Sequence, residues 1–148
     1  SKTSYDAIIA LDTDIILQPT WTSYVNDNLH RTDGVLSLYN SVAHKSISCS
    51  KSMCTKKDIG SAAVVMHRHV ISDMLRHNHN SAFDWGFSAY FTDADIRMLV
   101  PEHSMACHFG VVGTHSSPGH LKELAYMFDM SAQPKWVALY LDYVLKQK

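Results

Sequence analysis

Apolar residues along this chain gather in short runs of strand or helix length, separated by polar segments. The first run, residues 5–11, is continuous rather than alternating, which is typical of a buried strand in a parallel sheet, and it ends at Asp12 and Asp14. Residues 21–29 have the spacing of an amphipathic helix, and residues 34–39 predict a second strand. This order of strand, helix and strand indicates an α/β fold.

The rest of the chain alternates in the same way. The expected elements that follow are strands at residues 61–66, 96–100 and 104–112, and helices at residues 70–76, 84–91 and 133–148. Residues 40–58 are rich in serine and lysine and predict a mobile surface loop. No internal repeat or linker interrupts the pattern, so residues 1–148 are expected to form one α/β domain.

Composition narrows the class of protein. The 148 residues are 46% hydrophobic and 18% charged, which fits a globular domain and excludes a disordered chain. The net charge of -1, without a basic run, gives no reason to expect nucleic acid as a partner. The apolar runs are shorter than the roughly 20 residues of a membrane helix, and the N-terminus lacks the apolar core of a signal peptide. We therefore expect no membrane span and a cytoplasmic location.

The cysteines point to the same compartment. Cys49, Cys54 and Cys107 cannot all pair with each other, and a chain of this length does not need disulfides to hold its core. The spacing of Cys49 and Cys54 also differs from that of a zinc knuckle. Reduced cysteines in a reducing compartment are the simpler expectation.

Asp12 and Asp14 are the sharpest chemical feature of the sequence. Two carboxylates just past a strand can present oxygen ligands to a hard divalent cation, in the crevice where open α/β sheets bind ligands. Such a cation would neutralise a diphosphate. The alternative is that both residues cap the next segment or lie in a solvated turn.

The same region carries a resemblance to a known family. The segment YDAIIALDTDIILQPTW resembles the metal-binding strand of GT-A-fold glycosyltransferases, which use sugar nucleotides as donors. Later segments resemble further parts of that fold in the same order, namely GVLSLYN, GSAAVVMHRHVISDML, FDWGFSAYF and CHFGVVGTHS. The resemblance implies a mixed, mostly parallel sheet flanked by helices.

It also implies roles for individual residues at a metal site. Asp14 would bind the metal directly, Asp12 would lie nearer the ribose or reach the metal through water, and His108 would be the third protein ligand. An imidazole in the ligand set favours Mn²⁺ over Mg²⁺. His115 is a second candidate, for the metal or the diphosphate.

The resemblance also implies two residues near the sugar that accepts the transferred group. Asp84 matches the position of the general base in inverting members of the family, although it can also be the N-cap of the helix that follows. Trp85 can stack on a sugar face or belong to the core.

The implied function is transfer of a hexose or deoxyhexose from a UDP-sugar to a glycan acceptor. The sequence departs from the family pattern in one respect. In the family, the acidic pair normally follows a first β-α-β stretch that holds the nucleotide base. This stretch is missing here, so we expect the chain to be the C-terminal portion of a GT-A domain, with an N-terminal segment of the same protein as its partner.

Two other functions remain open at this point. A phosphatase of the haloacid-dehalogenase type also begins with an apolar strand and two aspartates, but Ile16 stands where that family has Thr or Val. A non-catalytic module that binds nucleotide sugars, or an inactive fragment, is the alternative from a different class.

Overall fold

The computed structural model describes residues 5–50, 52–77, 83–108 and 125–146. Its strands are, in chain order, β1 (Ala7–Leu11), β2 (Ile15–Leu17), β3 (Val35–Ser37), β4 (Ser46–Ser50), β5 (Met53–Lys56), β6 (Ala63–His67), β7 (Met98–Pro101) and β8 (Ala106–His108). Its helices are α1 (Trp21–Asn28), α2 (Arg68–Met74), α3 (Phe83–Asp93) and α4 (Lys135–Lys146), with short 3-10 helices η1 (Leu29–Arg31) and η3 (Met130–Ala132).

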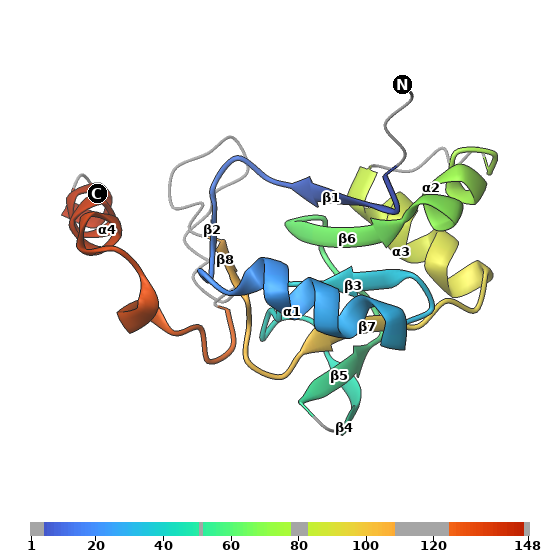
Figure 1. The fold of residues 1–148 in the computed structure, drawn as a ribbon, viewed down its shortest axis with the longest axis horizontal. Coiled ribbons are helices and arrows are strands. Elements are labelled where there is room, and N and C mark those ends of the chain that lie inside the picture. The colour runs from blue at the N-terminus through green and yellow to red at the C-terminus, as the bar shows by residue number, and fades with distance from the viewer. Residues whose placement is uncertain (1–4, 51, 78–82, 109–124, 147–148) are drawn as a thin grey trace.

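Six strands form one mixed sheet in the order β1-β6-β3-β7-β5-β4, and β2 and β8 form a separate ladder (Figure 1). Successive residues of β6 face opposite sides of the sheet, as the period of a strand requires. Val64 and Met66 pack with Val70 of α2 and Phe91 of α3. Val65 packs on the other side with apolar residues of α1 and η1. The sheet is therefore flanked by helices on both faces, as expected for an α/β domain.

The strand directions correct the expectation of a mostly parallel sheet. Among the described strands only β3 and β7 pair in parallel, and the other pairings are antiparallel. β1 lies at one end of the sheet, where Ile8 and Leu11 are 38% and 45% exposed. A continuous apolar run does not reveal this, because the partner that fixes a strand's direction lies far along the chain.

Residues 40–58 were expected to form a loop, but they contain a β-hairpin. β4 pairs with β5, and β5 pairs with β7 inside the sheet. Cys49 and Cys54 are directly opposite each other in this hairpin and form a disulfide. The prediction that these cysteines are reduced is therefore wrong. Disulfides are typical of oxidising compartments, so the argument from cysteines for a reducing compartment does not hold.

The remaining expected elements are present where the chain is described, with ends shifted by a few residues. The strand expected at residues 104–112 is described only as β8, because residues 109–124 lie outside the described part. No described helix is both long and apolar enough to cross a bilayer.

The C-terminal helix α4 stands apart from the sheet, on the far side of β2 and β8 (Figure 1). The segment before it is fixed to β2 by two glutamines. Gln18 donates from Nε2 to the carbonyl oxygen of Asp129 at 2.9 Å, and Gln133 donates to that of Leu17 at 3.2 Å. Leu139 and Tyr143 of α4 are 70% and 62% exposed.

Candidate metal centre at the carboxyl edge of the sheet

The topology brings several strand ends to one edge of the sheet. β1 and β3 are both antiparallel to β6, and β7 is parallel to β3, so the carboxyl ends of these three strands lie together. The amide of Asp12 donates to the carbonyl oxygen of Ala62 at 3.0 Å, at the start of β6. The acidic pair therefore begins at the edge where open α/β sheets bind ligands.

The β2–β8 ladder brings a histidine to this edge. Ile15 is paired with His108, so the residue before Ile15, Asp14, comes next to the histidine. Backbone hydrogen bonds fix the ladder on the sheet, since the amide of Ala106 donates to the carbonyl oxygen of Leu38 at 3.1 Å. His108 Nε2 lies 3.0 Å from Asp14 Oδ1.

Asp12, Asp14 and His108 offer one ligand atom each, and these atoms lie within 4.8 Å of one another. The side chains of His108 and Asp14 are 26% and 36% exposed, so the group is accessible from solvent but partly enclosed. Two carboxylate oxygens and one imidazole nitrogen suit Mn²⁺ better than Mg²⁺, because Mg²⁺ prefers oxygen alone. The residues present thus fit the expected cation.

Tyr39 and Cys107 flank His108 in different ways. The ring of Tyr39 lies edge-on to the imidazole with 6.2 Å between centroids, and it forms a buried wall beside it. Cys107 precedes His108 in β8 and is the free cysteine of the chain. Burial raises the pKa of its thiol.

The other expected site residues are not brought into this group by the described structure. Asp84 and Trp85 belong to the first turn of α3, and their side chains lie outside the described part of the chain. His115 lies outside the described residues.

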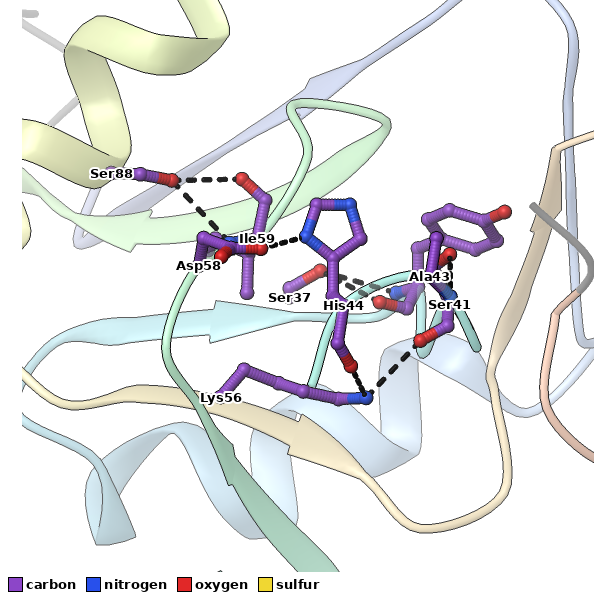
Figure 2. A network of polar contacts seen from close by, with 9 residues as sticks. Ser37, Ser41, Ala43, His44, Lys56, Asp58, Ile59 and Ser88 are labelled. Carbon is purple, nitrogen blue, oxygen red and sulfur yellow. Dashed lines mark hydrogen bonds and ion pairs between the residues drawn. The ribbon is translucent and has the colours of Figure 1, made fainter. Parts of the chain in front are cut away.

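A second polar group, next to the segment that leads into β6, was missed by sequence reasoning. His44 follows β3 and Asp58 precedes β6, and His44 Nδ1 is hydrogen-bonded to Asp58 Oδ1 (Figure 2). The two residues are 14 positions apart and lie on different segments, so no local spacing marks them as a pair. Only the pairing of the strands around them brings them together.

The chain matches neither any of the family models nor any of the curated proteins with which it was compared.

Proposed function

We propose that the protein is a metal-dependent glycosyltransferase. It transfers a hexose or deoxyhexose from a nucleoside diphosphate sugar, with UDP as the expected nucleotide, to a hydroxyl group of a glycan acceptor with inversion. The observation that supports this proposal is the convergence of Asp12, Asp14 and His108 at the carboxyl edge of the sheet. A bound Mn²⁺ or Mg²⁺ would neutralise the charge that develops on the departing diphosphate.

The residues divide into a donor side and an acceptor side. Asp14 and His108 would hold the cation, and Asp12 would serve the ribose or reach the cation through water. The resemblance assigns His115 to the metal or the diphosphate, Trp85 to a sugar face and Asp84 to the proton of the acceptor hydroxyl. The acidic pair alone would repel a diphosphate, so donor binding must depend on the cation.

Calorimetry tests this dependence directly. UDP is titrated into the protein with Mn²⁺ and again with EDTA, and binding is expected only with Mn²⁺. Asp14→Ala removes a carboxylate ligand and should abolish the Mn²⁺-dependent binding, whereas Asp27→Ala, at an exposed position of α1, should retain it. Equal UDP affinity with and without the cation would contradict the proposal.

The same measurement examines the histidine. His108→Ala should lower the affinity for Mn²⁺ about 10-fold or more. Loss of a residue that only hydrogen-bonds to a metal ligand already has an effect of that size, and His108 is proposed to bind the metal directly. His30→Ala, at an exposed position of η1, is the matched control. Binding of Mn²⁺ and UDP without release of UDP from any sugar nucleotide would favour the non-catalytic module.

A further inference from the structure

The pair His44 and Asp58 lies outside the metal centre, next to the segment that leads into β6. Asp58 and Gly60 lead into β6, and Ala62 of that segment accepts the amide hydrogen of Asp12. His44 comes from the segment that leaves the carboxyl end of β3. A Cβ atom at Gly60 would lie 3.8 Å from His44 Nε2, so the imidazole lies beside the segment that leads to Ala62 and, through it, to Asp12.

A buried lysine fixes the segment that carries His44 (Figure 2). Lys56 Nζ donates to the carbonyl oxygen of His44 at 2.6 Å and to that of Ser41 at 3.1 Å. Lys56 is 5% exposed, and burial lowers the pKa of its amine. Burying such a group is costly unless it is hydrogen-bonded, so its two backbone partners hold the loop in one conformation.

Asp58 is held from the opposite side by α3. The buried Ser88 donates from Oγ to the carbonyl oxygen of Ile59 at 2.9 Å and accepts the amide hydrogen of Ile59 at 3.4 Å (Figure 2). Because Asp58 directly precedes Ile59, these two hydrogen bonds also fix the position of the Asp58 carboxylate relative to His44. Imidazole and carboxylate are supported by separate elements, which keeps the pair preorganised.

The hydrogen bond fixes the proton arrangement on the imidazole. An ionised carboxylate only accepts hydrogen bonds, so His44 donates from Nδ1, and in the neutral imidazole the lone pair is then on Nε2. The side chains of His44 and Asp58 are 27% and 41% exposed, so a ligand can reach them. A Cβ atom at Gly60 would be in van der Waals contact with Nε2 at 3.8 Å, a contact that the glycine does not make.

We propose that His44, oriented by Asp58, is the general base of the transfer reaction, in place of Asp84, to which the resemblance assigns that role. This inference rests on the proposed function. Nε2 of His44 takes the proton of the acceptor hydroxyl, and the hydroxyl oxygen forms a bond to the anomeric carbon. The bond from that carbon to the diphosphate oxygen breaks, and its electron pair leaves with the nucleoside diphosphate. The carboxylate of Asp58 stabilises the imidazolium that results.

The experiment measures UDP release from a panel of UDP-hexoses with Mn²⁺ and methyl glycosides as acceptors. His44→Gln should lower kcat on the order of 10²-fold, with unchanged affinity for UDP and Mn²⁺. Asp58→Asn should also lower kcat, because the amide can donate to Nδ1 and so favour the wrong tautomer. His30→Gln, with an equally conservative change on η1, should behave as wild type.

Chemical rescue distinguishes a role of His44 as general base from a purely structural role. His44→Ala should regain part of its activity when free imidazole is added, whereas a variant that lost activity through altered folding would not respond. Thermal unfolding of each variant serves as the check on folding.

Three outcomes would overturn the inference. A normal kcat in His44→Gln together with a loss in Asp84→Asn would return the base to Asp84 and leave the proposed function intact. Lack of Mn²⁺-dependent UDP binding in the wild type would instead overturn the proposed function, and the base with it. Binding without any UDP release would overturn transfer, and the assignment of His44 with it.

Discussion

Single buried polar side chains hold the edge of the sheet where the candidate site lies. Asn40 is 4% exposed, and its Nδ2 donates to the carbonyl oxygens of Pro101 at 2.9 Å and of Glu102 at 2.8 Å. Its own amide donates to Ser104 Oγ at 2.9 Å. One side chain thus joins the segment after β3 to the end of β7, close to the start of β8.

Replacement of this side chain should have a clear effect on stability. Asn40→Ala leaves the buried carbonyl oxygen of Pro101 and the partly buried one of Glu102 without these donors, so the free energy of unfolding should fall by about 1 to 3 kcal/mol. Chemical denaturation of the variant and of Asn26→Ala, an exposed position of α1, provides the comparison. Equal losses in both variants would show that the buried contacts contribute nothing.

At the same scale, the sequence identified only part of the candidate site. Asp12 and Asp14 were expected from the strand that they follow, and His108 only from the resemblance. The structure places one ligand atom of each within 4.8 Å of the others. The pair of His44 and Asp58 was not expected, because neither residue belongs to a motif. Their contact depends on the segment between β3 and β4 meeting the segment between β5 and β6.

Among elements, the hairpin of β4 and β5 differs most from its expectation. Its outer strand is exposed along its whole length, and Lys56 in its inner strand is buried, so neither strand shows a clear apolar pattern. Helices and buried strands such as α1 and β6 could be predicted, because local spacing of apolar residues is enough for them. The direction and partners of strands could not, because they depend on distant residues.

The disulfide of this hairpin allows a prediction at the element scale. Cys49 and Cys54 are separated by 5 positions, and a loop this short should contribute about 2 kcal/mol through the entropy of the unfolded chain. Addition of a reductant should therefore lower the midpoint of urea unfolding.

Two variants serve as controls for that measurement. Cys49→Ser should make the midpoint insensitive to reductant, whereas Cys107→Ser should leave the effect of reductant in place, because Cys107 is already free. A wild-type midpoint that does not change on reduction would contradict the stabilising role of the disulfide.

For the whole molecule, the metal centre couples ligand binding to global stability. Its residues come from the ends of β1 and β8, so a ligand bound there stabilises the folded chain and not the unfolded one. With Mn²⁺ and UDP at roughly 100 times Kd, stability should rise by about 2.7 kcal/mol and Tm by roughly 5 to 10 °C. Differential scanning calorimetry should show no such rise for Asp14→Ala.

The β2–β8 ladder has a consequence for the order of folding. It pairs Ile15 with His108, residues separated by about ninety positions, so it closes one of the longest loops of the described fold. The hairpin of β4 and β5 needs only local contacts and can form early, whereas closure of a long loop becomes favourable once the intervening strands are in place. The three ligands of the metal centre are therefore expected to come together late, so the complete cation site should form only after the intervening strands.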